Sequence, residues 1–363
     1  MANKKRSVLV TGVSHYWGGR LASLLEEDQE VGTLIGIDYK KPEQKFKKLE
    51  FFQIEPHHPL LAELLTVAEV DTICHLLFVD AYRPSEEIFD LNVMGFMDLL
   101  AAAAAGQTPR VVIMSDTRVY GAHPKKPNFL LEHTELAQSA SHPYVSDRIE
   151  IEKFADRFSR TNDKPELTIL RFANILGHKA DTPMKRYLAP PAAPTAFGFD
   201  PMFQLTHEED VLAALLHALK TDVSGAFNIA GDGVMPLTQI LRIGDRVPLP
   251  VGVPVIKIGG FLTRKTCFPD SLPIASDYLK FPCVGETVKM KEVLGFTPKY
   301  STRQTAEDFY ENMRLSRYLP RPAGIESDPQ ASEQLEEYIQ TRRREAGYLF
   351  ELMQEIEDHG QEQ

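Results

Sequence analysis

The residues whose types and spacing most clearly point to chemistry form a turn between an expected strand and an expected helix, Thr11-Gly12-Val13-Ser14-His15-Tyr16-Trp17-Gly18-Gly19. Small residues in such a turn let the backbone bend sharply, approach a pyrophosphate and pack the helix on the strand. The helix N-terminus then offers free N–H groups and partial positive charge to the phosphates. His15 stands where a middle glycine is usual. The turn predicts a dinucleotide site formed by Gly12, Ser14, His15, Tyr16, Trp17 and Gly18.

Asp38 supports this interpretation, because it ends the second expected strand about 20 residues after the turn. A carboxylate there accepts hydrogen bonds from the adenosine ribose hydroxyls and repels a 2′-phosphate, which favours NAD over NADP. Lys40 and Lys41 weaken that preference, since a nearby cation offsets the repulsion. The alternative is that Asp38 is only a polar residue in a strand-end turn.

The elements that must position these residues alternate between strand and helix patterns up to residue 178. Short β-branched runs indicate strands, and amphipathic or alanine-rich stretches between them indicate helices. This alternation predicts an α/β fold, a Rossmann-like doubly wound parallel sheet. The expected strands are 7–10, 33–38, 51–55, 72–77, 110–115 and 167–172, and the expected helices are 18–25, 60–67, 88–105 and 145–157.

Three regions follow from the change in pattern after residue 178. Residues 1–178 are expected to form the dinucleotide-binding domain, completed by a strand near 203–231. Residues 179–310 are expected to form a smaller substrate lobe interleaved with it, and 311–363 a helical C-terminal extension. Within the lobe we expect an extended proline-rich loop at 189–194 and helices at 208–219 and 236–243.

The C-terminal extension carries an apolar stripe at steps of three and four residues within 331–359, interrupted by Arg342. Such a stripe packs either on its own domain or against a second copy as a homodimer seam. Both interpretations stay open at the level of sequence.

Several segments, taken in order from Val8 to Phe309, resemble the extended short-chain dehydrogenase/reductase family, in its NAD-dependent epimerase/dehydratase group. The resemblance implies NAD as cofactor and a small-molecule substrate. The segments are VLVTGVSHYWGGRLA, CHLL, NVMG, MSDTRVYG, YVSDR, LRFANILG, QLTHEEDV, GAFNIAGD and LGFTPKYSTRQTAEDF.

The resemblance also implies a tyrosine that exchanges a proton with a substrate hydroxyl or carbonyl while hydride moves to or from the nicotinamide. Tyr144 takes that position. Lowering a phenol pKa from about 10 by about three units requires roughly 4 kcal/mol of phenolate stabilisation. The residue four positions on supplies the charge from the same helical face, and here it is Arg148 instead of the family's lysine. Arginine stays cationic, but its planar fork reaches the nicotinamide ribose differently.

The position of the family's hydroxyl donor is also changed, because Asp116 stands there between Ser115 and Thr117. An ionised aspartate only accepts hydrogen bonds, and its charge opposes a developing alkoxide. Either Thr117 or Ser115 substitutes for the donor, or Asp116 stays protonated, or Asp116 does different chemistry. A pairing with Arg148 or Arg118 would leave it inert.

Further contacts follow from the resemblance. It places Leu76, Asn92 and Ser115 beside the cofactor together with Tyr144 and Arg148. It places Tyr120, Asn174 and His207 on the substrate side, although a lone histidine is more often a satisfied core residue.

The predicted function is that of an NAD(P)-dependent oxidoreductase, epimerase or dehydratase acting on a hydroxyl or carbonyl. A nucleotide-sugar substrate would use cations such as Lys185 and Arg186, whereas the apolar loop 188–201 favours a lipid-like substrate. Because two of the three catalytic positions are changed, the alternative is a dinucleotide-binding protein without turnover, serving a sensing or assembly role.

Composition narrows the possible partners. The net charge of −11 over 363 residues repels a phosphate backbone, so no nucleic-acid partner is expected. No apolar run reaches the roughly 20 residues of a membrane span. Three widely spaced cysteines indicate neither a disulfide framework nor a structural zinc site. We therefore expect a cytoplasmic protein without a bound metal.

Overall fold

The computed structural model describes residues 5–316, except for 56, 81–84, 139–142 and 253–273. By the density of its contacts the chain divides into two compact units, Met1–Asn312 and Met313–Gln363. The helix expected at 331–359 lies outside the described residues.

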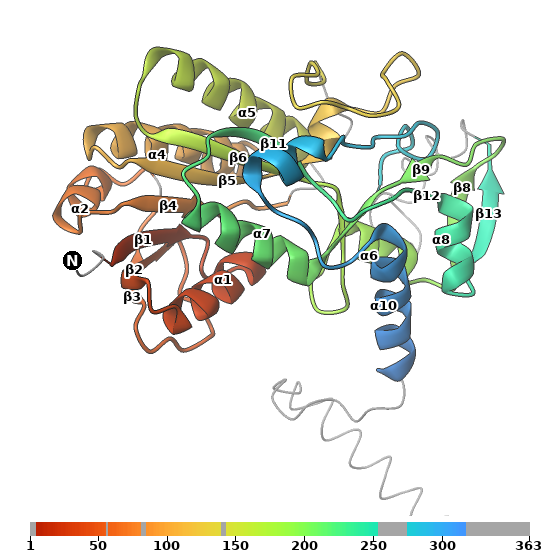
Figure 1. Ribbon diagram of the computed structural model, residues 1–363, viewed down its shortest axis with the longest axis horizontal. Coiled ribbons are helices and arrows are strands. Elements are labelled where there is room, and N and C mark those ends of the chain that lie inside the picture. Colours follow the sequence, from red (N-terminus) through yellow and green to blue (C-terminus); the bar gives the residue numbers. More distant parts are fainter. Residues whose placement is uncertain (1–4, 56, 81–84, 139–142, 253–273, 317–363) are drawn as a thin grey trace, which may run out of the picture. The chain divides into compact units, whose positions relative to one another are not determined.

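A seven-stranded parallel sheet forms the centre of the first unit (Figure 1). Its strand order is β11-β6-β5-β4-β1-β2-β3, so the direction of winding reverses beside β1. This is the doubly wound parallel sheet that the alternating pattern predicted. The strands are β1 (Arg6–Thr11), β2 (Val31–Asp38), β3 (Glu50–Gln53), β4 (Thr72–His75), β5 (Arg110–Asp116), β6 (Glu166–Phe172) and β11 (Gly225–Ile229).

Helices cover both faces of this sheet (Figure 1). On one face lie α1 (Tyr16–Glu27) and α7 (Glu208–Lys220), whose apolar residues share a core with those of β1. On the other face lie α2 (Leu61–Val67), α4 (Gly95–Ala105) and α5 (Pro143–Thr161). Because both faces are covered, a central strand can be apolar on both sides, and every residue of β4 is buried.

The helix expected at 88–105 is longer and less regular than predicted. It begins with α3 (Glu86–Phe89), passes through a π-helical turn η1 (Asp90–Met94) and continues as α4. Together these form the one helix, among the described residues, that is long and apolar enough to cross a membrane by length and composition, although Glu86, Glu87, Asp90 and Asp98 interrupt its apolar residues. Core helices pass the same test, and Phe96 and Leu99 are buried in the core here, so this is weak evidence of a span.

The second lobe consists of short elements between and after the last strands of the sheet. The extended loop expected at 189–194 is wrong beyond Pro191, because β8 (Ala192–Ala196) pairs in parallel with β13 (Val247–Val251). Proline is tolerated there because each strand of a two-stranded sheet keeps one open edge. The remaining elements are η2 (Thr117–Tyr120), β7 (Asn174–Leu176), α6 (Pro183–Leu188), β9 (Met202–Phe203), β10 (Leu205–His207), β12 (Met235–Pro236), α8 (Leu237–Ile243), η3 (Met290–Leu294) and α10 (Thr302–Leu315).

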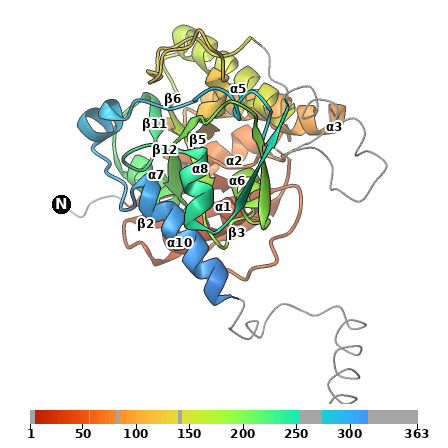
Figure 2. The same ribbon diagram turned by 90° about the vertical axis from the view of Figure 1, so that its right-hand side faces the viewer.

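Helix α10 closes this lobe against α6 and α8 (Figure 2). The Tyr310 hydroxyl donates to the carbonyl of Leu188 at 3.3 Å. A side chain at Gly244, directly after α8, would strike the Tyr310 ring, so the helices meet closely at a residue without a Cβ.

Candidate functional site

The glycine turn is built as tightly as a dinucleotide turn requires. Gly12 has a φ of 75°, and a Cβ there would lie 2.7 Å from the backbone nitrogen of Leu77. A Cβ at Gly18 would overlap the carbonyl of Gly12. Both glycines are therefore needed to bring β1, α1 and the end of β4 together.

His15 occupies the middle position without strain. Its backbone is extended, with a φ of −98°, so no glycine is required there. The imidazole lies 5.8 Å from the Tyr39 ring, and its Nε2 is buried with no hydrogen-bond partner within the described ranges. Burial lowers the His15 pKa, partly offset by the nearby Asp38 carboxylate. A neutral imidazole with a free nitrogen thus stands beside the turn.

Asp38 is fully buried at the end of β2 and binds the turn itself. Its Oδ2 accepts hydrogen bonds from the Ser14 amide at 2.9 Å and from the Ser14 hydroxyl. Its Oδ1 is buried and has no partner among the residues that the structure describes. An unpartnered buried carboxylate oxygen fits the ribose hydroxyls of a dinucleotide, because these would supply the missing donors. Ser14 lies at the turn as predicted, with its hydroxyl committed to Asp38.

The two aromatic residues of the turn point to different surroundings. Tyr16 donates to the buried carboxylate of Glu208 at 3.3 Å, and burial followed by the charge of Glu208 raises the Tyr16 pKa. Trp17 lines a cleft at the carboxyl ends of β4 and β5. Of these two residues, Trp17 is therefore the one placed at the cleft.

The cleft consists of two adjoining hollows that share Trp17, Asp80, Met114, Ser115 and Arg148. The inner hollow continues to His75, Leu76 and Ile151. The outer hollow continues to Asp116 at the end of β5, to Arg118 in η2, and to Asn174 and Asp181. This position, at the carboxyl ends of parallel strands, is where doubly wound sheets bind ligands.

Arg148 lies at the junction of the two hollows. Its guanidinium stacks over the Phe78 ring at 3.9 Å and donates through Nη1 to the Met114 carbonyl at 2.9 Å. Its Nε is buried and finds no partner in the described part of the chain. Tyr144 lies one turn earlier in α5, and its side chain lies outside the described residues. The charged member of the predicted pair is therefore at the cleft with one donor unused.

Asp116 forms an ion pair with Arg118 and not with Arg148. Both Asp116 oxygens accept from the Arg118 Nε, at 2.8 and 2.9 Å, and Oδ1 also accepts from the Arg118 amide at 2.7 Å. Burial alone would raise the Asp116 pKa, but the charge and hydrogen bonds of Arg118 hold it below its ordinary value. Asp116 is therefore ionised, which is contrary to the alternative of a protonated carboxyl.

The hydroxyls on either side of Asp116 differ in their access to the cleft. Ser115 lines both hollows, and its hydroxyl donates to the buried carboxylate of Glu152. Thr117 is buried in η2, where its carbonyl accepts from the Cys283 thiol at 3.3 Å, and it lines neither hollow. The structure thus brings Ser115, and not Thr117, to the site.

Asn92 is fully buried behind the cleft and makes only internal contacts. Its amide bridges both backbone groups of Val79 and donates to Asp147 of α5 at 2.9 Å. It fixes the segment after β4 against α5. Leu76, in contrast, lines the inner hollow.

Of the three residues predicted on the substrate side, the structure places Asn174 at the cleft. Tyr120 is fully buried, donates to Asn228 and accepts from Arg171, each at 2.7 Å. Burial raises the Tyr120 pKa to about 12 despite the charge of Arg171. Tyr120 therefore holds the interior together away from the described hollows.

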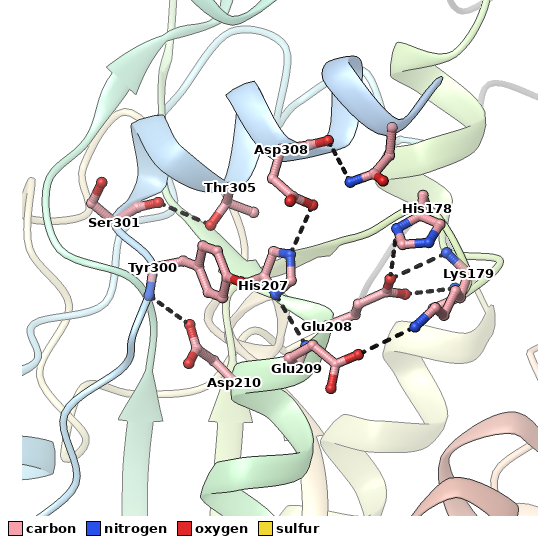
Figure 3. A network of polar contacts seen from close by, with 12 residues as sticks. His178, Lys179, His207, Glu208, Glu209, Asp210, Tyr300, Ser301, Thr305 and Asp308 are labelled. Carbon is pink, nitrogen blue, oxygen red and sulfur yellow. Dashed lines mark hydrogen bonds and ion pairs between the residues drawn. The ribbon is translucent and has the colours of Figure 1, made fainter. Parts of the chain in front are cut away.

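His207 is likewise a satisfied interior residue. Its Nδ1 accepts from the Glu209 amide at 3.2 Å, capping α7, and its Nε2 meets Asp308 at 3.1 Å. The ring stacks on Tyr300 with centroids 3.8 Å apart. Figure 3 shows His207 between Tyr300 and Asp308, while Glu208 turns toward His178 and Lys179. His207 thus has no free nitrogen for a substrate.

Two residues that the sequence analysis did not single out belong to this region. Glu208 is buried and accepts from the amides of Lys179 and Ala180, at 3.2 and 2.7 Å, as well as from Tyr16 (Figure 3 shows its contacts on the 178–179 side). His75 lines the inner hollow with a free Nε2. The signal for His75 was a histidine at the end of the buried strand Thr72–His75.

The sequence matches the family described as NAD dependent epimerase/dehydratase over residues 8–230. An uncharacterised protein of Mycobacterium tuberculosis is 33% identical over 319 residues, covering 85% of this chain and 84% of that protein. The UDP-glucose 4-epimerase of Lactobacillus helveticus is 24% identical over 325 residues, covering 81% and 92%. Among solved structures, dTDP-glucose 4,6-dehydratase from Bacillus anthracis in complex with NAD shares the fold, with a TM-score of 0.64 at 18% identity over 87% of this chain and 99% of that one.

Proposed function

Because this chain belongs to the NAD-dependent epimerase/dehydratase family, we propose that it is an enzyme that uses NAD to move hydride to or from a carbon bearing a hydroxyl or carbonyl group. In this proposal Tyr144 exchanges the proton of that group, and Arg148 stabilises the phenolate. Asp38 disfavours the additional phosphate of NADP, because its buried carboxylate already lies where the ribose is expected.

The position of Arg148 is the observation that supports this proposal most directly. Arg148 lines the same cleft as Trp17 of the glycine turn, and no described residue partners its Nε. Tyr144 lies four residues earlier in α5, a spacing that puts two residues on one helical face. A fixed positive charge beside the cofactor turn favours the anionic form of a neighbouring phenol.

We propose a nucleotide sugar as the substrate class, because UDP-glucose and dTDP-glucose occur in the names of a relative and of a structural neighbour. Asn174 and Asp181 line the outer hollow where such a substrate would enter. Arg186 donates to Asp181, one of the residues that line that hollow, at 2.8 Å. A lipid-like substrate is the second candidate, supported by the exposed side chains of Phe197 and Phe199 in the segment after β8.

The experiment is a comparison of wild-type protein and Tyr144→Phe. NAD binding is measured by calorimetry, and formation of reduced nicotinamide is followed by absorbance with a panel of nucleotide sugars and lipid alcohols. We expect Tyr144→Phe to lower turnover by about 10²- to 10⁴-fold and to leave NAD affinity nearly unchanged. Tyr187→Phe, which removes a buried hydroxyl bound to the Pro194 carbonyl, is the matched control. Turnover that survives in Tyr144→Phe would refute the tyrosine mechanism.

Binding without turnover is the second candidate function. It is favoured by the Asp116–Arg118 ion pair, which places an ionised acceptor where a hydroxyl donor would assist catalysis. Tight NAD binding with no reduction by any substrate of the panel would establish it. Arg148→Lys tests the role of the arginine in either case: a loss of turnover from an active wild type would make the arginine an adaptation, and turnover that appears where the wild type has none would make it a lesion.

The location and assembly of the protein belong to the same proposal. We propose a cytoplasmic homodimer. The described cysteines Cys74 and Cys283 are free thiols, as is usual in a reducing compartment. The seam of the dimer is proposed at 331–359, from the apolar stripe in the sequence.

A further inference from the structure

His75 is a buried polar residue that the proposed chemistry does not use. It ends β4, opposite Thr11 of β1 in the parallel register. The residue is 4% exposed and lines the inner hollow of the cleft. Its Nδ1 lies 3.0 Å from the Thr11 hydroxyl, and its Nε2 is buried without a partner among the described residues.

The hydrogen bonds of Thr11 determine where the imidazole proton lies. The Thr11 oxygen accepts from the amides of Leu76 and Leu77, each at 3.0 Å. A hydroxyl has two acceptor lone pairs and one proton, so its proton must go to the Nδ1 of His75. Nδ1 is then an acceptor, and Nε2 carries the proton of the neutral ring. Burial and, to a smaller extent, the charge of Arg148 lower the His75 pKa to about 3, so the ring is neutral at physiological pH.

Two residues that line the inner hollow therefore each carry a buried N–H donor that nothing in the described chain satisfies. One is Nε2–H of His75, and the other is Nε–H of Arg148. Buried donors without acceptors are unfavourable and rare, which points to an acceptor that is bound in the hollow. The other residues that line the hollow are mainly apolar, and Trp17 and Leu76 connect it to the glycine turn.

We propose that Nε2–H of His75 donates a hydrogen bond to an oxygen in the nicotinamide riboside half of the bound NAD. This bond would position the cofactor beside Arg148. The assignment rests on NAD binding. Asp38 at the end of β2 marks the adenosine side, and His75 ends β4 on the opposite side of β1. The acceptor is a ribose hydroxyl or the nicotinamide carboxamide, both of which offer an oxygen.

Nuclear magnetic resonance on the full-length wild-type chain, labelled with ¹⁵N in its histidines, tests the assignment directly. The His75 signals are identified by their loss in His75→Phe. We expect a neutral ring protonated at Nε2, whose shift changes with NAD but not with ADP, since ADP ends at the diphosphate. A change with ADP-ribose assigns the acceptor to the ribose, and a change with NAD alone assigns it to the nicotinamide. A proton on Nδ1, or signals unmoved by saturating NAD, would overturn the proposal in favour of a bound water.

Calorimetry on variants provides the second test. His75→Phe keeps a ring but removes the donor, and we expect about tenfold weaker NAD binding with unchanged ADP binding. His75→Gln, whose amide nitrogen can replace Nε2, is expected to restore part of the loss. His57→Phe, at an exposed histidine, is the matched control. Wild-type NAD affinity in a folded His75→Phe would refute the role of His75, whereas no NAD binding by the wild type would refute the proposed function instead.

Discussion

The Asp116–Arg118 ion pair is a feature whose energetic cost can be measured. Both side chains are largely buried, with 10% and 12% of their surface exposed. Breaking a buried pair from one side leaves a charge that has lost its counter-ion. Asp116→Asn keeps the shape and removes the charge, and we expect it to lower the free energy of unfolding by about 3 kcal/mol. Glu307→Gln breaks an exposed ion pair with Arg303 and should cost at most about 0.5 kcal/mol.

The same pair makes a prediction about pH. The folded-state pKa of Asp116 is depressed by Arg118 against the opposing effect of burial. A depressed carboxyl pKa stabilises the fold at pH values above the ordinary value of 3.8 and loses that contribution as pH falls through the folded-state pKa. Chemical denaturation should therefore show a constant difference between wild type and Asp116→Asn near neutrality, narrowing below about pH 3.8. A difference that widens in acid would contradict the ion-pair assignment.

Asp38 provides a test of cofactor choice at the residue scale. Its free Oδ1 is expected to accept from the adenosine ribose, and its charge to repel a 2′-phosphate. Asp38→Ala should weaken NAD binding by about tenfold or more and NADP binding by less, because the repulsion disappears together with the acceptor. Calorimetry with both cofactors gives the ratio. Equal losses would show that the carboxylate acts only by holding Ser14.

The tight geometry of the glycine turn and the position of Asp38 at the end of β2 could be predicted, because their signals are local: a required small residue and a fixed spacing after the turn. The ion-pair partner of Asp116 could not be predicted, since Arg118 and Arg148 were equally plausible cations in the sequence. The 3₁₀ turn η2 decides between them by bringing the Arg118 amide and guanidinium onto the same carboxylate. The free nitrogen of His75 depends on the bonds of Thr11, a residue 64 positions away.

At the scale of elements, Glu208 joins three parts of the chain at the start of α7. Its carboxylate accepts from Tyr16 of α1 and from the amides of Lys179 and Ala180 after β7 (Figure 3 shows its contacts on the 178–179 side). Gly177 allows this approach, because a Cβ there would overlap the Glu208 side chain. The arrangement fixes the glycine turn relative to residues 179–180, which lead directly to Asp181 of the outer hollow.

Glu208→Ala should therefore be strongly destabilising. It leaves the buried Ala180 amide without an acceptor and opens space beside Gly177, and we expect a loss of about 2–4 kcal/mol. Glu209→Ala, at the next position of the same helix but 45% exposed in its side chain, should change stability by less than about 0.5 kcal/mol. Thermal and chemical unfolding measure both. Similar losses of stability in the two variants would show that the Glu208 carboxylate does not stabilise the fold through these contacts.

The strands of the sheet and the helices that cover it could be predicted from the sequence. The central strands are apolar on both faces because both are buried, and the helices are apolar on the one face that packs against the sheet. The ends of the strands were less well predicted. The strand expected at 72–77 ends at His75, because the next amide, that of Leu76, donates to the Thr11 hydroxyl instead of to a neighbouring strand. The pairing of β8 with β13 was missed. It joins segments 55 residues apart in the register Ala192↔Val247, and the prolines of β8 resemble those of a loop.

At the scale of the whole molecule, the sheet and the second lobe share one compact unit, Met1–Asn312. The chain crosses between them repeatedly, since β11 returns to the sheet after β7, α6 and β8–β10 have entered the lobe. The cleft combines residues from both, with Arg148 from α5 and Asn174 from β7. An interleaved chain of this kind predicts that sheet and lobe unfold in one cooperative transition.

The C-terminal extension allows a test of assembly that is independent of the cleft. The homodimer hypothesis predicts that the full chain sediments as a dimer, and that a chain ending at Leu315 sediments as a monomer with unchanged NAD affinity. The alternative, in which the stripe at 331–359 packs on its own domain, predicts monomers in both cases and a lower melting temperature after truncation, because apolar surface becomes exposed. Leu349→Asp in the full chain is the matched point substitution, since it places a charge within the stripe without shortening the chain. A truncated chain that remains dimeric would place the interface elsewhere.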